Sequence, residues 1–391
     1  MRRRDVLAGG ATVAGAAVAG CSLRAEETIP SLSSDWPRPR YDERGTGYRE
    51  DRAPVSEGDP SVRWSAPIDA DESDRPEPVV VDDVVYVNTR SEVVAFDAAD
   101  GEQRWRRRIA DEPSVRGYAR GPLTVAGGRL FAGSHGGLFA LDTDGTVVWS
   151  VEGDGEFPAG SVSGSPVVAD GTVFFAVGDT GYAYTVDGEE LWARDLGSFA
   201  FSAPAFAAPA AGDEAVYFGG NAGDLHRIRP DGTREWTSPV AAYVYPLAVA
   251  PGVAGDAVYV PRNDAIVEVD AETGERRNAL PIGSMDAPLV VTAVGLKNYV
   301  YASGGSGKAV FGVSTDPFGV QSARTFDTRG TGVTAVGSSL YLTHKNGLWV
   351  GPRLEDDPAW TVETEDALRG GVAVTDEAVF ATSRDTLYGI A

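Results

Sequence analysis

Six of the chain's tryptophans recur at a nearly constant spacing, and this spacing limits the fold more than any other feature of the sequence. The first four intervals are 41, 44, 43 and 44 residues, and the last tryptophan follows after a further 124. A glycine stands four residues before four of these tryptophans, and Gly274 stands four residues before Asn278, where another tryptophan is expected. Such self-similarity indicates repeats of about 42 residues. The six tryptophans are Trp64, Trp105, Trp149, Trp192, Trp236 and Trp360.

Each repeat carries the signals of four short strands. Runs rich in β-branched and aromatic residues, such as 84–87 and 173–176, come before an Asp-Gly turn, and a tryptophan run follows it. The Asp-Gly pair predicts a tight hairpin, because glycine adopts the positive φ that the turn requires. The 48 glycines and 24 prolines fit a chain with many turns. A repeated four-stranded unit of this length is typical of a β-propeller blade.

Counting these units predicts eight blades. The last repeat stops at 387–390 without a tryptophan strand, whereas 61–68 is a tryptophan strand with no repeat before it. We therefore expect an all-β fold over 56–391, an eight-bladed β-propeller of four-stranded antiparallel blades, closed by the N-terminal strand joining the last blade. The second strands of the eight blades are expected to begin near Val84, Leu130, Val173, Val216, Val258, Val300, Leu340 and Val379.

The repeat also has a family resemblance. The pattern Ala-x-Asp-x-x-Asp-Gly-x-x-x-Trp over 95–105 resembles the repeat of the pyrroloquinoline-quinone-like (PQQ-like, quinoprotein-type) propellers, and the segment 36–48 resembles their lead-in. The resemblance implies that each repeat tryptophan packs between two blades and that the Asp-Gly turn supports it. The sixth repeat, 314–325, departs from the pattern, with Pro317-Phe318 where the turn is expected.

Two functional branches follow from this resemblance. One is the quinoprotein alcohol or sugar dehydrogenases, which implies PQQ with calcium. The other is shorter binding proteins such as the BamB-like lipoproteins. Dehydrogenases of this kind are much longer and typically carry adjacent cysteines, whereas this chain has one cysteine. We therefore assign no catalytic residue, no metal ligand and no cofactor, interpret the repeat tryptophans as structural, and keep PQQ with calcium as the alternative.

The N-terminus predicts export and lipidation. Arg3 and Arg4, within 3–7, resemble the twin-arginine export signal, and 18–21 resembles a lipobox that ends at the only cysteine, Cys21. The apolar run 6–19 is 14 residues long, shorter than the ~20 of a membrane-spanning helix. We expect 1–20 to be a cleaved signal peptide and 21–55 a lipid tether and lead-in. The alternative is an ordinary signal with an incidental cysteine.

Charge restricts the partners. The net charge is −23 and the pI is about 4.5, which argues against a nucleic-acid partner. Three of the 34 basic residues are lysines, and few lysines with many Asp and Glu resemble the proteins of extreme halophiles. With one cysteine and three histidines, the sequence also argues against a disulfide framework, a Cys-rich zinc site or a Cys-His nucleophile pair.

Arginines and aromatic residues precede several of the predicted first strands, at one mouth of the ring. One interpretation is a mouth that binds an anionic, partly aromatic ligand, with arginines on its acidic groups and rings stacked on it. The other is that these arginines pair with Glu77, Asp286, Glu365 and Asp366 and tie blades together. The predicted mouth residues are Arg75, Arg116, Arg120, Phe199, Phe201, Tyr243, Tyr245, Arg329 and Arg369.

These observations favour an exported lipoprotein held on the outer, extracellular face of the cytoplasmic membrane. We expect its propeller to be a monomeric, non-catalytic scaffold that binds envelope proteins or peptides, with a small anionic ligand as a further possibility. The alternatives are a PQQ-dependent redox enzyme and an extracellular ligand sensor.

Overall fold

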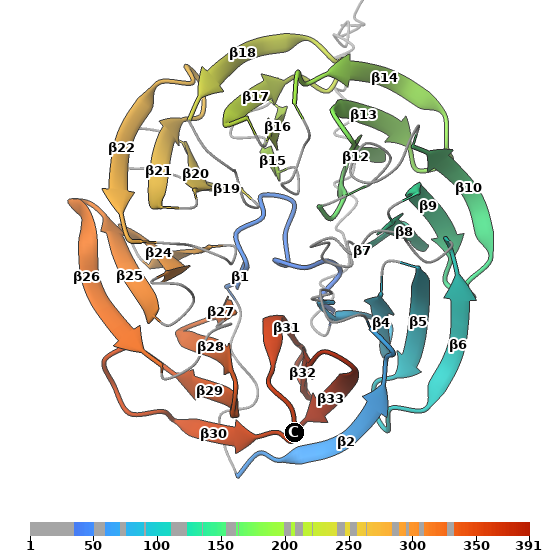
Figure 1. Cartoon of the computed structure of the whole chain (residues 1–391), viewed down its shortest axis with the longest axis vertical. Coiled ribbons are helices and arrows are strands. Elements are labelled where there is room, and N and C mark those ends of the chain that lie inside the picture. Colours follow the sequence, from blue (N-terminus) through green and yellow to red (C-terminus); the bar gives the residue numbers. More distant parts are fainter. Residues whose placement is uncertain are drawn as a thin grey trace, which may run out of the picture. The chain divides into compact units, whose positions relative to one another are not determined.

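The computed structural model contains strands, turns and loops, and no helix among the residues that it describes. It describes residues 35–50, 59–70, 76–89, 91–110, 123–134, 136–153, 162, 164–198, 205–207, 214–220, 222–240, 247–250, 256–262, 264–283, 289–294, 297–304, 309–326 and 332–391. The strands form eight sheets arranged in a ring, which confirms the predicted eight-bladed β-propeller (Figure 1).

Blades 1 to 4 are consecutive four-stranded antiparallel sheets. Blade 1 has β3 (Val79–Val81), β4 (Val84–Asn88), β5 (Glu92–Asp97) and β6 (Gln103–Arg108). Blade 2 has β7 (Leu123–Ala126), β8 (Arg129–Ser134), β9 (Gly137–Asp142) and β10 (Val147–Glu152). Blade 3 has β11 (Val167–Ala169), β12 (Thr172–Val177), β13 (Thr180–Thr185) and β14 (Glu190–Asp195). Blade 4 has β15 (Ala205–Ala207), β16 (Ala215–Gly219), β17 (Asp224–Ile228) and β18 (Arg234–Pro239).

Blades 5 to 8 continue the ring, and only the last two depart from the four-strand order. Blade 5 has β19 (Ala248–Ala250), β20 (Ala257–Pro261), β21 (Ala265–Asp270) and β22 (Arg276–Pro281). Blade 6 has β23 (Val290–Val294), β24 (Lys297–Gly304), β25 (Ala309–Thr315) and β26 (Phe318–Thr325). Blade 7 has β27 (Val333–Val336), β28 (Ser339–His344), β29 (Gly347–Gly351) and β30 (Trp360–Glu363), with β1 (Tyr48–Arg49) added beside β27. Blade 8 has β31 (Arg369–Val374), β32 (Val379–Thr382), β33 (Thr386–Ile390) and β2 (Val62–Pro67).

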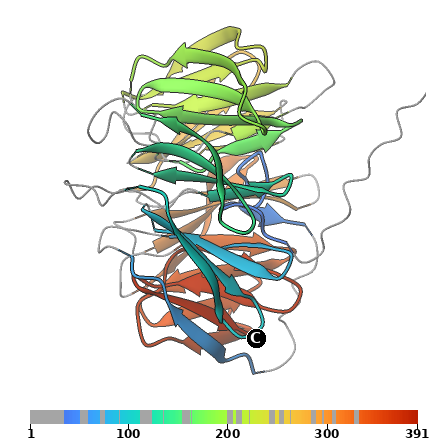
Figure 2. The same ribbon diagram turned by 90° about the vertical axis from the view of Figure 1, so that its right-hand side faces the viewer.

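The two ends of the ring meet in blade 8. Strand β2 pairs antiparallel with β33, with Trp64 opposite Gly389. Ser61 and Ala391 exchange two backbone hydrogen bonds at the end of this ladder. Figure 2 shows β2 (blue) beside the C-terminal strands (red). The predicted closure by the N-terminal strand is therefore confirmed, and it leaves no open first or last blade.

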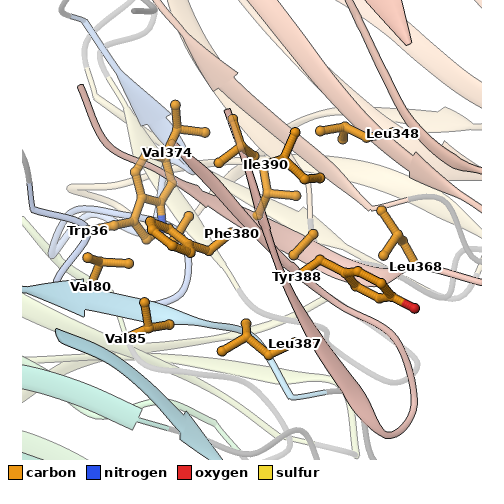
Figure 3. Packing of buried hydrophobic residues seen from close by; sticks show 14 of the residues in the cluster. Trp36, Val80, Val85, Leu348, Leu368, Val374, Phe380, Leu387, Tyr388 and Ile390 are labelled. Atoms are coloured by element: carbon orange, nitrogen blue, oxygen red, sulfur yellow. The ribbon is translucent and has the colours of Figure 1, made fainter. Parts of the chain in front are cut away.

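The core runs through the blade interfaces. Its largest described cluster joins the blades on both sides of the closure (Figure 3). Trp36, which precedes the blades, belongs to the same cluster and is fully buried. Burial of these apolar side chains stabilises the closure by the hydrophobic effect. Members of the cluster include Leu348 from blade 7, Phe380 and Ile390 from blade 8, and Val85 from blade 1.

Residues 35–49, here called the lead-in, cross the first strands of the ring (Figure 1, blue). Strand β1 within it pairs parallel with β27 of blade 7. The Arg49 guanidinium reaches blade 8, where Nη1 donates to the backbone oxygen of Val374 at 2.9 Å. The lead-in therefore joins six blades. Its backbone hydrogen bonds to the blades link Trp36 with Val80, Pro37 with Val125, Arg44 with Val249, Thr46 with Val291, Gly47 with Ala335 and Arg49 with Gly337.

Candidate functional site

Of the predicted mouth residues, Arg369 alone lies among the residues that the structure describes, and it is the first residue of β31. The other predicted mouth residues, together with Arg3, Arg4 and Cys21 of the export and lipidation signals, lie outside the described residues. These mouth residues are Arg75, Arg116, Arg120, Phe199, Phe201, Tyr243, Tyr245 and Arg329. The mouth therefore stays a prediction, and the described residues bear on its surroundings only.

The backbone next to Arg369 holds a buried carboxylate from the neighbouring blade. The backbone N–H of Gly371 donates to Oε1 of Glu77 at 3.2 Å, and Glu77 comes just before the first strand of blade 1. A Cβ on Gly370 would lie 2.9 Å from Cγ of Glu77. Thr343 of blade 7 donates its hydroxyl to the Gly370 backbone oxygen at 2.8 Å. Glu77 was one of the acidic residues of the pairing interpretation, and it lies where blades 7, 8 and 1 meet.

Two other acidic residues of the pairing interpretation are described, and the third is not. Asp366 accepts a hydrogen bond of 3.4 Å from the Tyr388 hydroxyl, within blade 8. Glu365 is exposed, and Asp286 lies outside the described residues.

The repeat tryptophans lie between blades. Trp105, on the fourth strand of blade 1, donates its indole N–H to the backbone oxygen of Thr143 in blade 2 at 2.9 Å. Its ring packs on Gly145 of that turn, whose φ is +85°, and a Cβ there would lie 2.9 Å from the ring. Only a residue without a side chain fits both the backbone conformation and the space. The same packing of ring on glycine pairs Trp64 with Gly101, Trp149 with Gly188, Trp192 with Gly232 and Trp236 with Gly274. The indole N–H also donates to the next blade in the first three of these, but that of Trp236 has no hydrogen-bond partner among the described residues.

These tryptophans share one position in the sheet, here called the interface position. It faces the third strand of its own blade immediately after a β-bulge, as Trp105 faces Ala95. In blade 5 the interface position is Asn278, opposite Glu268, and in blade 6 it is Ser322, opposite Gly312. Asn278 donates to the Glu268 carboxylate at 2.6 Å, within its own blade. Two consecutive blades therefore lack the tryptophan.

Blade 6 contacts blade 7 through an arginine instead. Arg324 stands two residues after the interface position, and its guanidinium lies 4.7 Å from the ring centroid of Trp349 in blade 7. Its Nη1 donates to the backbone oxygens of Leu354 and Asp356 at 2.9 and 2.8 Å. Arg107 and Arg194, at the equivalent position of blades 1 and 3, donate to Gly145 and Gly232 of the next blade. Sequence reasoning missed these arginines, although their fixed offset of two residues is visible in the sequence.

Trp360 belongs to the same series, at the start of the fourth strand of blade 7. Its ring lies 6.1 Å from that of Tyr341, and it packs in the cluster around the closure. No third-to-fourth-strand turn follows in blade 8, because β33 and β2 come from opposite ends of the chain.

The lead-in holds the densest group of buried charged side chains in the described structure. Arg38, Arg40 and Arg49 are buried, and burial lowers the pKa of Arg38 to about 10. The Asp42 carboxylate accepts hydrogen bonds of 2.8 Å from the backbone N–H and the hydroxyl of Thr46. Burial raises the pKa of Asp42 above its ordinary value, against these hydrogen bonds. The family resemblance over 36–48 included Arg38, Arg40 and Asp42 without giving them a role, and Arg49 lies just beyond that segment.

No metal site is evident among the described residues. None of their His, Cys, Asp and Glu side chains form a group of three or more that could hold a metal ion. The adjacent cysteines expected of the dehydrogenase branch are missing from the sequence, whose single cysteine is Cys21. A helix long and apolar enough to cross a membrane is also not found in the described part of the chain.

Comparison with known proteins agrees with this geometry. The family described as outer membrane protein assembly factor BamB matches residues 53–179 and 140–351, which is most of the chain. The outer membrane protein assembly factor BamB of Shewanella oneidensis is 31% identical over 245 residues, covering 55% of this chain. The match spans 60% of the length of that relative.

Two solved structures share the fold. BamB from Moraxella catarrhalis has a TM-score of 0.61 at 16% identity and covers 83% of this chain and 98% of that one. The quinohemoprotein alcohol dehydrogenase ADHIIG from Pseudomonas putida HK5 has a TM-score of 0.71 at 14% identity and covers 92% of this chain and 80% of that one. At such identities the structures establish the fold and leave function open. The matches over 53–351, on blades whose turns and tryptophans follow one repeat, place this chain in the family of outer membrane protein assembly factor BamB.

Proposed function

We propose that this chain is an exported, lipid-anchored scaffold whose propeller binds proteins or peptides of the cell envelope without catalysing a reaction. Its family supports this proposal, because the curated relatives are named outer membrane protein assembly factors. The lipobox at 18–21 and the paired Arg3 and Arg4 support export and attachment through Cys21, on the outer face of the cytoplasmic membrane.

The observation that carries the proposal is the outer rim of blades 2 and 3. Among the described strands, each fourth strand pairs with a third strand on one side only, which leaves its other edge as a surface where a partner strand could pair. On β10, Val147 and Val148 are 41% and 43% exposed, and on the neighbouring β14 Leu191 is 47% exposed. Large apolar side chains on adjacent outer strands of a chain with net charge −23 are suited to a protein partner.

Site-specific photocrosslinking in intact cells tests this rim. A photoreactive residue at Leu191 should crosslink to a defined envelope protein, whereas the same residue at Val320, equally exposed on blade 6, should give little product. Equal crosslinking from both positions, or none from Leu191, would argue against a binding rim on blades 2 and 3.

Lipid anchoring has a separate test. Cys21→Ser should release the exported protein from the membrane fraction into the medium, because the cysteine sulfur carries the lipid. A protein that stays in the membrane after this substitution is held by something else.

The proposal includes the absence of a quinone cofactor. Titration of PQQ with calcium into the folded protein, followed by tryptophan fluorescence, should give no saturable signal. Stoichiometric binding would favour the redox alternative.

A further inference from the structure

Arg38 of the lead-in has a buried guanidinium group that is only partly hydrogen bonded. The residue is 3% exposed. Its Nη1 donates to the backbone oxygen of Asp42 at 3.0 Å, whereas Nε and Nη2 have no hydrogen-bond partner. Burying donors of a charged group without acceptors is costly, and such groups in native proteins usually contact a water or an ion. Nε and Nη2 of Arg38 are therefore two buried donors that an acceptor, either a water or an anion, can satisfy.

The two orphaned nitrogens lie on the same edge of the guanidinium plane. In arginine, Nε–H and one N–H of Nη2 point in parallel, and this edge matches two oxygens of a carboxylate or phosphate. The third nitrogen, Nη1, is the one that the Asp42 carbonyl engages. The lead-in thus fixes the guanidinium by one nitrogen and leaves the bidentate edge available.

Three other charged side chains of the lead-in have hydrogen-bond or ion-pair partners of their own, and the Asp42 and Glu43 charges act on Arg38 through space. The Asp42 carboxylate accepts from Thr46, and Arg49 forms an ion pair of 2.5 Å with Asp376. Arg40 donates from Nε to the Gly45 backbone oxygen at 2.7 Å. In the described part of the chain, Arg38 has no ion pair with any carboxylate. Its buried positive charge is therefore not compensated by a direct contact.

We propose that Arg38 is the centre of an oxyanion-binding site inside the ring of first strands, where the lead-in crosses them. The ligand class is a small carboxylate or phosphate, held through Nε and Nη2. The lead-in would position the guanidinium, because backbone bonds from Trp36 to Val80 and from Val125 to Pro37 fix the chain just before it on blades 1 and 2. Arg38 is not among the predicted mouth residues or the exposed residues of blades 2 and 3.

The test compares the full chain with Arg38 variants by thermal unfolding in phosphate, acetate or chloride at constant ionic strength. Phosphate or acetate should raise the melting temperature saturably in the wild type. Arg38→Met keeps the length of the side chain without the charge and should not respond. Arg276→Met, at an exposed arginine of β22, should respond as the wild type does. Arg38→Lys keeps the charge without the bidentate edge and should bind about tenfold more weakly.

The outcomes separate the sources and decide the proposal. A rise in melting temperature with acetate alone identifies a carboxylate ligand, and a rise with phosphate alone identifies a phosphate ligand. Either result supports the site. A wild type that responds to neither, that responds to chloride as strongly, or that matches Arg38→Met would overturn it. If Arg38→Met does not fold, equal oxyanion affinity of the wild type and Arg38→Lys would overturn it instead.

Discussion

Seven of the eight blade interfaces of this propeller fall into two groups that are filled by different side chains, and Trp360 lies at the eighth, between blades 7 and 8. From blade 8 through blade 5, a tryptophan at the interface position packs on a glycine turn of the next blade, five times in succession. From blade 5 to blade 7, Asn278 and Ser322 take that position, and Arg324 contacts Trp349 from a site two residues further along. The first group is encoded by a repeated Trp-Gly pair. The second lacks that pair, and in blade 6 the contact comes from the arginine position that blades 1 and 3 also use.

The difference teaches that the ring needs a filled interface and tolerates a change of chemistry there. A tryptophan ring on a backbone turn contributes mainly apolar burial and, in four of the five interfaces, an indole hydrogen bond. An arginine over an indole contributes a cation–π contact together with bonds to backbone oxygens. We expect the tryptophan interfaces to be the more sensitive to truncation.

The largest expected effect is the loss of one repeat tryptophan. Trp192→Ala should lower the free energy of unfolding by about 3 kcal/mol, because its ring is buried between blades 3 and 4. Asn278→Ala, at the same position of blade 5, should cost less than about 1 kcal/mol, since it removes a hydrogen bond within its own blade. Chemical denaturation at fixed salt measures both, and equal losses would erase the distinction between the two groups.

A matched pair of glycines separates backbone conformation from packing. Gly274 and Gly171 both have a φ of +74°, but a Cβ on Gly274 would lie 2.8 Å from the Trp236 ring, whereas one on Gly171 would meet nothing within 4 Å. Gly171→Ala should cost about 1 kcal/mol through its φ alone. Gly274→Ala should cost about 2 kcal/mol, since the ring must also move. If the Gly171→Ala and Gly274→Ala variants had identical unfolding midpoints, the glycine turn would not support the tryptophan.

The arginine contact should matter less than a tryptophan but more than an ordinary surface arginine. Arg324→Ala removes the contact with Trp349 and two hydrogen bonds to blade 7, at a cost of about 1.5 kcal/mol. Arg276→Ala, at an exposed arginine on β22, should change stability by less than about 0.5 kcal/mol. If the two variants unfold alike, blade 6 is joined to blade 7 by other contacts.

The smallest expected effect is a pH dependence of the melting temperature, which involves one histidine in each of the two groups of blades. Burial lowers the pKa of His226 in blade 4 and of His344 in blade 7 below the ordinary 6.5. The folded state then favours the neutral imidazole. The stability that the neutral histidines contribute is therefore complete above pH 6.5 and is lost as the pH falls below that value. His226→Gln and His344→Gln should each flatten the fall in melting temperature between pH 7 and pH 5. A fall that is unchanged in both variants would assign it to other groups.

The sequence predicted the ring because its information is local and repeated. Each glycine with a tryptophan four residues later indicates one hairpin, and the alternation of strands and turns indicates a blade. The closure followed from the unmatched strand at 61–68. The rest depends on contacts between distant residues: Arg49 reaches Val374 across 325 positions, and Arg324 reaches Leu354 across 30. No local pattern marks which blades a side chain will touch.

The candidate sites were less predictable for the same reason. The mouth was inferred from residue types before the first strands, and only Arg369 among them is described. Arg38 could be read from the sequence as one more arginine in an Arg-rich chain. Its significance comes from being buried with two nitrogens unpartnered, which is a property of the folded lead-in.

The central claim, a propeller that binds an envelope partner through its rim, is tested most directly by isolating the protein from membranes under mild extraction. The wild type and Val320→Lys should each be recovered with the same stoichiometric protein partner. The double variant Val148→Lys with Leu191→Lys should lose that partner while keeping the wild-type melting temperature. Recovery of the partner with the folded double variant, or a wild type that carries no partner and binds PQQ with calcium stoichiometrically, would contradict the account.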